Sequence, residues 1–333
     1  MSKQEQQPPE QAAIELAVII NSFNRLSLLR EALPSITKAL GQIPLKGAVI
    51  VFDAGSNDGS IQFLENFSAT IQDPQIICLC PSADADRSFS AGCNFAVQFA
   101  AQKFSLLKYC LFFETDNLIY NESALPLAVE LLQREEKLAA VGFTVEKCDG
   151  RKAGFGARFP TALSFVFGQQ FSHILGLERM IISQWYPFSG VRWGFSDIVF
   201  TSPILVRYSA WQSTGGMDTA SFPYSDCDGD WCWMAYKKSW RIAVLDVPGV
   251  IHDNQMQFSA WSGNRVINFH QARLRLLLKH RGRWIGLLKP LLFLRHSLEF
   301  LALLLLKENS AAKKSLTYRL KLIANVFNNY ELF

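Results

Sequence analysis

Short apolar runs alternate with longer segments of helical spacing through the first half of the chain. The short runs are rich in β-branched and aromatic residues and predict strands, whereas apolar residues at intervals of three and four predict helices. We expect strands at about 16–21, 47–52, 75–80, 108–113 and 138–145, and helices at about 26–40, 60–68, 88–103 and 122–137. This alternation predicts an α/β fold with a mostly parallel sheet flanked by helices.

The pattern changes after residue 150. Residues 150–196 scatter glycine and proline among Phe and Trp, which predicts a long loop region with short helices that shapes an acceptor site; an aromatic core over the sheet is the alternative. Residues 198–207 predict an edge strand, because Pro203 cannot donate to a ladder. The spacing of Trp231, Met234 and Lys238 predicts a helix that begins near Asp228.

The C-terminal segment is apolar but interrupted by charge. Lys289, Arg295, His296 and Glu299 fall within about 120° of a helical wheel, so residues 284–306 predict an amphipathic helix. Its uncharged stretches are shorter than the roughly 20 residues that cross a bilayer. The segment therefore predicts attachment at a membrane interface, or a helix packed on the rest of the protein or on another subunit.

Charge divides the chain unevenly. Residues 263–333 carry 13 Lys+Arg and 3 Asp+Glu, against 20 and 26 in residues 1–262. Such a basic segment predicts an anionic partner: a membrane surface, nucleic acid, or the acidic face of its own domain. Because leucine-rich faces interrupt the basic residues, the prediction is a membrane surface and no nucleic acid.

Length and composition set the domain organisation. With 333 residues and 49% hydrophobic content, the chain can bury a large core. We expect a disordered polar tail at 1–13, an α/β domain at 14–262 and a basic amphipathic helical region at 263–333. The tail has no apolar segment typical of a signal peptide, and the seven cysteines include no C-x-x-C pair. Both observations predict a cytoplasmic protein with free thiols.

Acidic residues follow two of the predicted strands. Asp53 ends the second strand, where a carboxylate is placed to bind a nucleobase or ribose, or simply to form an Asx turn. Glu114 and Asp116 follow the fourth strand, and two carboxylates one residue apart can hold Mg²⁺ or Mn²⁺ against a diphosphate.

These segments, in this order, resemble the family 2 glycosyltransferases with the GT-A fold, and especially their rhamnosyltransferase-like branch. The resemblance runs from about Ile14 to His252 and rests on several ordered motifs: Ser22-Phe23-Asn24-Arg25, Asp53 to Ser60, Phe89 to Asn94, Glu114-Thr115-Asp116, Gly215-Gly216-Met217-Asp218, Asp228-Gly229-Asp230-Trp231-Cys232-Trp233 and Val250-Ile251-His252.

The resemblance implies a GT-A catalytic domain at 14–262 and an inverting, metal-dependent transferase that uses Mn²⁺ or Mg²⁺. It would move a hexosyl or deoxyhexosyl group from a nucleotide-diphosphate sugar to a hydroxyl of a glycan or lipid-linked acceptor in cell-surface polysaccharide assembly. With the basic tail, it predicts a cytoplasmic protein peripheral on the inner face of the cell membrane. The alternative is a non-catalytic relative that binds a nucleotide sugar or glycan in assembly. Glu114 and Cys227, where the family has Asp and Glu, motivate that alternative. A nucleotidyltransferase is disfavoured, because residues 22–26 do not resemble a glycine-rich triphosphate loop.

Roles follow residue by residue from the resemblance. The catalytic base is Asp228, or Asp226 if the register slips by two; a single displacement assisted by such a base inverts the anomeric centre. His252 is a further metal ligand or contacts the phosphate, and Arg87 contacts the phosphate or pairs with Asp84 or Asp86. The predicted metal ligands are Glu114, Asp116 and His252, and the predicted donor-binding residues are Asn24, Arg25, Asp53, Arg87, Asn94 and Asp116.

Overall fold

The computed structural model describes residues 13–174, 180–253, 264–305 and 319–327. Residues 1–12 of the predicted polar tail lie outside this range. The main sheet has nine strands in the order β3-β2-β1-β4-β11-β6-β12-β10-β9. Their bounds are β1 Leu16–Ser22, β2 Gly47–Asp53, β3 Gln75–Leu79, β4 Tyr109–Phe112, β6 Leu138–Phe143, β9 Trp185–Phe188, β10 Val191–Ser196, β11 Ile204–Arg207 and β12 Arg241–Asp246.

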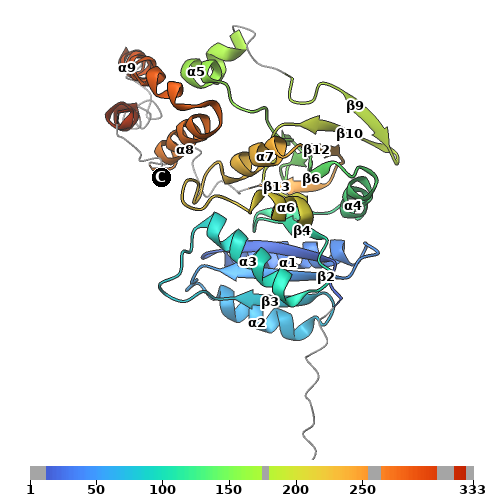
Figure 1. Cartoon of the computed structure of the whole chain (residues 1–333). Coiled ribbons are helices and arrows are strands. Elements are labelled where there is room, and N and C mark those ends of the chain that lie inside the picture. Colours follow the sequence, from blue (N-terminus) through green and yellow to red (C-terminus); the bar gives the residue numbers. More distant parts are fainter. Residues whose placement is uncertain (1–12, 175–179, 254–263, 306–318, 328–333) are drawn as a thin grey trace, which may run out of the picture.

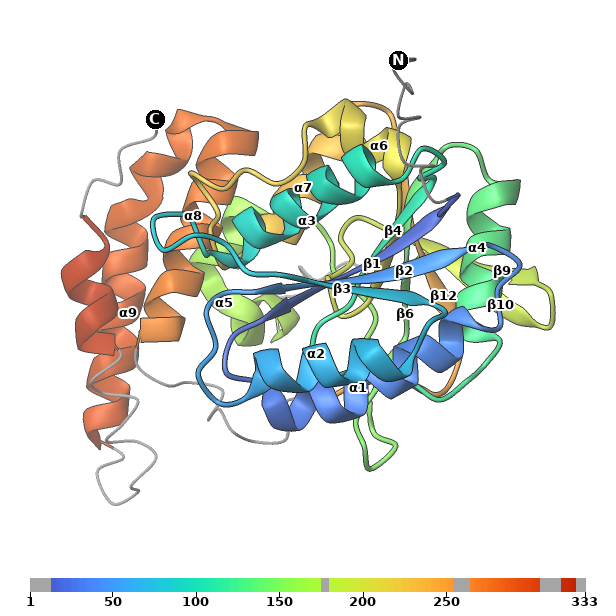
Figure 2. The ribbon, with the colours of Figure 1, turned by 90° about the horizontal axis from the view of Figure 1, so that it is seen from below.

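Helices cover both faces of this sheet (Figures 1 and 2). Alternate residues of each central strand point to opposite faces, so Val18 and Ile20 contribute to one core and Ala17 and Ile19 to the other. The first core takes up α1 (Leu26–Leu40), α2 (Ser60–Thr70) and α4 (Ala124–Arg134). The second takes up α3 (Phe89–Lys103), α6 (Tyr208–Thr214) and α7 (Cys227–Lys237). The predicted α/β architecture is confirmed.

Strand direction is mixed at two positions. Strands β10 and β11 run antiparallel to the other seven strands, which all run in one direction. The predicted edge strand at 198–207 is wrong, because β11 lies inside the sheet between β4 and β6. Pro203 precedes the first strand residue, Ile204, so no ladder hydrogen bond is lost.

The region predicted as a long loop with short helices contains more regular structure. Besides α5 (Ala162–Ile174), it forms the β9–β10 hairpin at the sheet edge. Ser189 and Gly190 connect the two strands with φ of 45° and 81°, the positive values that a two-residue hairpin turn requires. Tyr186, Trp193 and Phe195 pack against one another on this hairpin.

A second, small sheet brings distant segments together beside the main one. Its order is β5-β13-β7-β8, with β5 Asn117–Ile119, β7 Val145–Glu146, β8 Lys152–Gly154 and β13 Val250–His252. β13 runs antiparallel to β5, so that His252 lies opposite Asn117. This register brings His252, the last residue of β13, close to the residues that follow β4.

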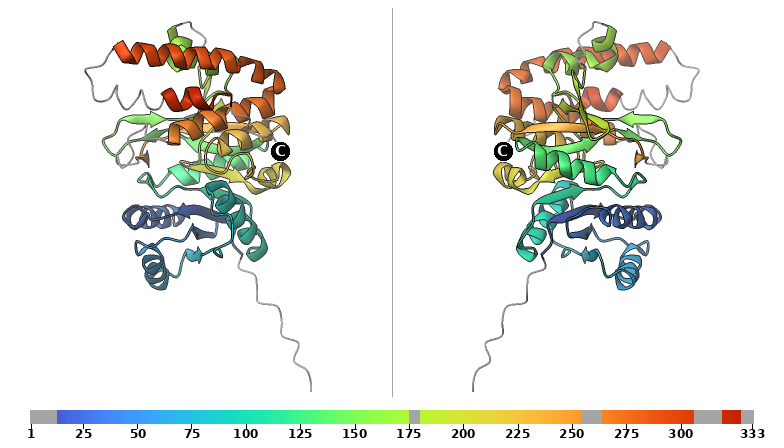
Figure 3. Two further views of the ribbon diagram at one scale, coloured as in Figure 1. Left: turned by 90° about the vertical axis from the view of Figure 1, so that its left-hand side faces the viewer. Right: turned by 90° about the vertical axis from the view of Figure 1, so that its right-hand side faces the viewer.

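The C-terminal helices lie at the end of the molecule opposite α2 (Figures 1 and 3). Helix α8 (Asn264–Arg281) packs on α7 and contributes Ala272 and Leu276 to the second core. The 3-10 helix η1 (Arg283–Leu288) and helix α9 (Lys289–Leu305) follow, and α9 contacts α5. Among the described residues, no helix combines the length and the apolar character that crossing a membrane would take.

Candidate active site

Three predicted metal ligands converge beside the end of β4. Glu114 and Asp116 follow this strand directly, and the β13–β5 register brings His252 next to them. One potential ligand atom from each of the three residues lies within 4.8 Å of the others. Two segments more than a hundred residues apart in sequence thus form one cluster.

The cluster has the chemistry of a divalent cation site. The Asp116 side chain is only 8% exposed, and its Oδ1 atom is buried without a hydrogen bond from any described residue. The Nδ1 atom of His252 lies 3.4 Å from that oxygen and 2.8 Å from Oδ1 of Asn117. A buried carboxylate oxygen without a donor is costly unless a cation meets it, and two carboxylates with an imidazole suit Mn²⁺. Burial lowers the pKa of His252, but the Asp116 and Glu114 carboxylates outweigh it and the net pKa is raised.

Glu114 is fixed by the segment that precedes β11. Because β11 pairs antiparallel with β4, Ile204 lies opposite Phe112, and the residues just before one strand meet those just after the other. The Thr201 hydroxyl donates to Glu114 Oε1 at 2.7 Å and the Ser202 hydroxyl donates to the same atom at 3.1 Å. No described residue donates a hydrogen bond to the second carboxylate oxygen, which leaves it available for a ligand.

Asp228 lies in the first turn of α7, close to this cluster. Its Oδ1 accepts a hydrogen bond from the Gly229 amide at 2.8 Å, and its Oδ2 accepts a long one from the Thr201 amide at 3.4 Å. Thr201 therefore contacts both Asp228 and Glu114. Burial, and then the negative charge of Asp226, raise the pKa of Asp228 to about 7. A carboxylate with that pKa is a competent general base near neutral pH.

Asp226, the alternative base, is committed to another contact. Arg273 of α8 donates to both of its oxygens, from Nε and from a terminal nitrogen, each at 2.8 Å. The Asp226 side chain is 6% exposed, and its φ of 58° lies in the left-handed region that non-glycine residues rarely adopt. The bidentate ion pair fixes this strained turn. Both oxygens of Asp226 are therefore engaged by Arg273, whereas Asp228 accepts hydrogen bonds only from two backbone amides among the described residues.

A second set of contacts from α8 holds Asp230. Lys279 donates to one carboxylate oxygen at 2.9 Å, and Nε2 of His280 lies 2.7 Å from the other. The His280 ring stacks on Trp233 with centroids 4.6 Å apart. Lys279 also bonds Asp218 at 2.8 Å. Part of the basic C-terminal segment thus neutralises the acidic face of α7, one of the three partners that its charge predicts.

Asp53 lies at the predicted end of β2 and forms an Asx turn. Its Oδ1 accepts from the amides of Gly55 and Ser56 at 3.0 and 2.6 Å, and its Oδ2 accepts from the Ser56 hydroxyl at 2.7 Å. The carboxylate is fully buried. Asp53 therefore shapes the turn at the strand end.

Asn24 and Arg25 lie beside this turn. The backbone amide of Asn24 donates to Ser56 Oγ, and the side-chain oxygen of Asn24 accepts from the backbone amide of Asn57, both at 2.8 Å. Arg25 stands immediately before α1, while Phe23 is exposed. The structure therefore brings Asn24, Arg25 and Asp53 together in one pair of interlocked loops.

Arg87 and Asn94 occupy different positions relative to this pair of loops. Arg87 reaches back to it and donates to the carbonyl oxygens of Ala54 and Ser82, each at 3.2 Å. Asn94 instead ties α3 to the loop before α7: its amide group donates to the Met217 carbonyl at 2.8 Å and accepts from the Met217 amide at 2.9 Å. The geometry gives Asn94 a structural contact, while Arg87 borders the predicted donor site.

Several site residues escape prediction from the sequence. Thr201 and Ser202 lie in a segment whose pattern indicates only a strand, and nothing in it marks their contact with Glu114. Arg273 lies 47 residues from Asp226, and the only sequence signal for the pair is the opposite charge of the two segments.

Breaking the Arg273–Asp226 pair is expected to destabilise the protein. Arg273→Gln would leave a nearly buried carboxylate without its cation, a change that typically costs about 3–5 kcal/mol. Denaturant unfolding of the full chain measures the loss. The matched control is Arg151→Gln, which removes an exposed pair with Asp149 and should leave the unfolding curve close to that of wild type. Equal losses in the two variants would contradict a structural role for Arg273.

The sheet order and the carboxylates at the strand ends define a GT-A fold. The sequence profile described as glycosyl transferase family 2 matches residues 17–186, just over half of the chain. The chain belongs to glycosyltransferase family 2 and is a glycosyltransferase, as the sequence motifs predict. A search of curated proteins returned no match to the sequence.

Solved structures show the same fold at low sequence identity. The mannosyltransferase PcManGT from Pyrobaculum calidifontis, in complex with GDP-Man and Mn²⁺, is 15% identical over 98% of this chain and 92% of that chain, with a TM-score of 0.55. Residues 1–349 of TarS from S. aureus, in complex with UDP-GlcNAc, are 14% identical over 94% and 81% of the two chains, with a TM-score of 0.52. GalNAc-T7 with UDP, GalNAc and Mn²⁺ is 10% identical over 80% of this chain and 48% of that one, with a TM-score of 0.53.

Proposed function

We propose that the protein transfers a sugar, with inversion, from a nucleotide-diphosphate sugar to a hydroxyl of a glycan or lipid-linked acceptor in cell-surface polysaccharide assembly. The observation that supports this proposal is the position of Asp228: Thr201 contacts both its carboxylate and Glu114 of the cluster of Glu114, Asp116 and His252, and the pKa of Asp228 is raised to about 7. A base and a diphosphate-binding cluster side by side are what a single displacement requires.

Asp228 performs the proton transfer in this proposal. The acceptor hydroxyl enters beside it, gives its proton to the carboxylate and attacks the anomeric carbon from the face opposite the diphosphate. Thr201 and Gly229 hold the carboxylate in place through their amides. Because one nucleophile displaces one leaving group, the anomeric configuration inverts.

Glu114, Asp116 and His252 would hold a Mn²⁺ or Mg²⁺ ion, which would supply Lewis-acid stabilisation for the negative charge of the departing diphosphate. The complexes of PcManGT and GalNAc-T7 with Mn²⁺ support this choice of metal. The interlocked loops of Asn24, Arg25 and Asp53 bind the nucleoside. Exposed Phe23 offers a ring on which a base can stack, and Arg87 borders the phosphates.

Release of nucleoside diphosphate tests the proposal. Purified protein is supplied with Mn²⁺ and a panel of UDP-, GDP- and dTDP-sugars, with and without a membrane extract as acceptor. The expected result is metal-dependent release from one donor class, increased by the extract. Tight donor binding without release under any condition would favour the second candidate function, a non-catalytic nucleotide-sugar binding relative, which the replacements at Glu114 and Cys227 motivate.

The pH dependence of kcat is expected to report Asp228. Its deprotonated form accepts the proton, so kcat should fall about tenfold per pH unit as the pH drops below about 7. Asp226→Asn removes a negative charge that raises this pKa, and in the folded protein should move the acidic limb to lower pH; unfolding curves verify folding, because the variant also weakens the pair with Arg273. Initial rates at saturating donor and Mn²⁺ measure both profiles. If Asp226 were the base, Asp226→Asn would lose activity at every pH.

We place the enzyme at the inner face of the cell membrane in this proposal. The 13 basic residues of segment 263–333, against 3 acidic ones, favour contact with anionic lipids, and a membrane location suits a lipid-linked acceptor.

A further inference from the structure

Helix α9 packs on the protein through its charged side. His296 is 2% exposed and Leu292 is 3% exposed, so this side faces inward. Arg295 donates from one terminal nitrogen to the carbonyl oxygens of Phe165 and Val166 in α5, at 2.8 and 3.2 Å. The polar face that the sequence predicts is therefore turned towards α5 and α8 instead of towards water.

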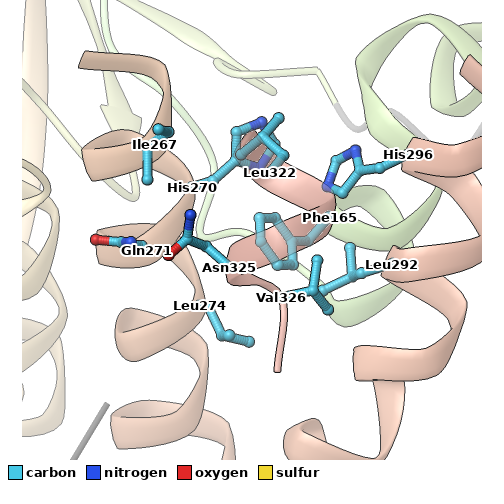
Figure 4. Close-up of a pocket in the computed structure, with 10 residues that line it drawn as sticks. All are labelled: Phe165, Ile267, His270, Gln271, Leu274, Leu292, His296, Leu322, Asn325 and Val326. Atoms are coloured by element: carbon cyan, nitrogen blue, oxygen red, sulfur yellow. The ribbon is translucent and has the colours of Figure 1, made fainter. Parts of the chain in front are cut away.

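The inward charges neutralise one another. Glu299 accepts a hydrogen bond from Arg295 at 3.1 Å and also pairs with Arg319. Burial alone would raise the pKa of Glu299, but His296 and the two guanidinium groups lower it to about 2. His270 and His296 pack edge to face with centroids 5.3 Å apart. Figure 4 shows both histidines among the apolar side chains of the pocket between these helices.

The outward side of α9 carries a stripe of leucines. They follow one another at intervals of three and four, which places them on one face of the helix. Their exposed fractions range from 49% to 88%, and the stripe is about 20 Å long at roughly 1.5 Å per residue. We call it the leucine stripe: Leu291, Leu294, Leu298, Leu301 and Leu305.

This arrangement is the reverse of a helix on a water-soluble surface, which turns its apolar face inward and its charges outward. A continuous exposed apolar stripe without charge marks a contact surface. Helix α5, which packs beside α9, adds exposed Leu163 and Phe167 at the same end of the molecule (Figure 3).

The segment that connects α8 to α9 has residues typical of a membrane interface. Arg281 and Arg283 are exposed there, together with Trp284. Tryptophan is enriched at the level of lipid headgroups, and arginine is attracted to anionic ones. Among the positions that flank the stripe, Pro290, Ser297 and Ala302 carry no charge, and Arg295 is engaged by Glu299 and the α5 carbonyls, so these positions do not present the opposite charges that pair two helices in a dimer seam.

We propose that the leucine stripe lies in the interfacial layer of an anionic phospholipid bilayer, with α9 parallel to the membrane surface. The stripe inserts among the acyl chains while Trp284 and the neighbouring arginines contact the headgroups. This assignment deepens the membrane location proposed above and rests on it.

Vesicle flotation of the full chain tests the assignment. Phosphatidylcholine vesicles with and without phosphatidylglycerol are compared for wild type, Leu294→Asp/Leu298→Asp and the control Leu106→Asp, a similarly exposed leucine beyond the end of α3. The wild type and the control should float with anionic vesicles, and the double variant should lose at least about 100-fold in partitioning. Substitution of exposed leucines leaves folding intact, which unfolding curves verify.

Two results would overturn the assignment. One is absence of wild-type flotation with anionic vesicles. The other is a concentration-dependent dimer in sedimentation that the double variant abolishes while flotation persists, since a second copy would then cover the stripe. Nucleoside diphosphate release in the absence of vesicles is measured in parallel. Because the stripe is remote from Asp228 in sequence and lies outside the active site, release by the double variant should equal that of wild type. A membrane failure is thereby distinguished from a failure of the proposed activity.

Discussion

Replacing Asp228 with asparagine is expected to lower kcat by about 1,000-fold while donor binding stays within about twofold of wild type. Asparagine keeps the shape of the side chain and its bond from the Gly229 amide, but it cannot accept the acceptor proton. Since we propose that the donor binds to the loops of Asn24, Arg25 and Asp53, its affinity should be unchanged. Single-turnover rates with saturating donor, beside calorimetric donor titration, separate the two quantities.

The control for this variant is Glu136→Gln, an exposed carboxylate in the turn before β6. It should retain wild-type kcat, because it lies at the opposite end of its strand from the site. A loss of donor affinity in Asp228→Asn, with kcat preserved, would contradict the role of base. Asp228→Glu should recover part of the rate, because it restores the proton acceptor at a slightly shifted position.

The pattern of residues predicts the N-terminal half of the fold closely. β1 to β4 and α1 to α3 follow the predicted ranges because their apolar periodicity is strong and their connections are short. The β9–β10 hairpin is missed, since its alternating aromatics are interrupted by Pro187 and Gly194. The sequence also gives no indication that β11 is central: a proline at a strand boundary looks the same as one at a sheet edge.

The candidate site likewise contains residues that the sequence predicts and contacts that it does not. Residues that follow strand ends are predictable, because parallel strands carry their carboxyl ends to one edge of a sheet. The Thr201 contact depends on the antiparallel pairing of β11 with β4, which residue spacing does not reveal. That contact also suggests why glutamate stands at position 114. Its longer side chain reaches the Thr201 and Ser202 hydroxyls with one oxygen and leaves the other for a ligand.

The structure meets one of the alternatives left open by the C-terminal pattern, and the other stays a prediction. Helix α8 packs on the acidic face of α7, as the protein-contact alternative predicts. Helix α9 exposes its leucines, and membrane contact stays a prediction for it. An amphipathic pattern is compatible with both alternatives, because periodicity tells which residues share a face but not what that face contacts.

Replacing Asp116 with alanine is expected to abolish metal-dependent release of nucleoside diphosphate, with a loss of at least about 1,000-fold in kcat/KM. Asp116 contributes to the cluster a buried carboxylate oxygen that has no hydrogen bond from any described residue, so its removal takes away a group that requires a cation. His252 would lose a carboxylate neighbour that raises its pKa.

Mn²⁺ binding, measured by electron paramagnetic resonance with nucleoside diphosphate present, gives a readout that is independent of turnover. Asp116→Ala should lose the bound signal, and Glu114→Asp should keep it, because the shorter carboxylate still offers an oxygen although it gives up the reach to Thr201. Glu136→Gln again serves as the surface control. Bound Mn²⁺ in Asp116→Ala at wild-type affinity would place the cation elsewhere. Loss of Mn²⁺ with full turnover would instead separate the reaction from the metal, and the charge on the leaving diphosphate would then fall to Arg87 and the backbone amides of the neighbouring loops.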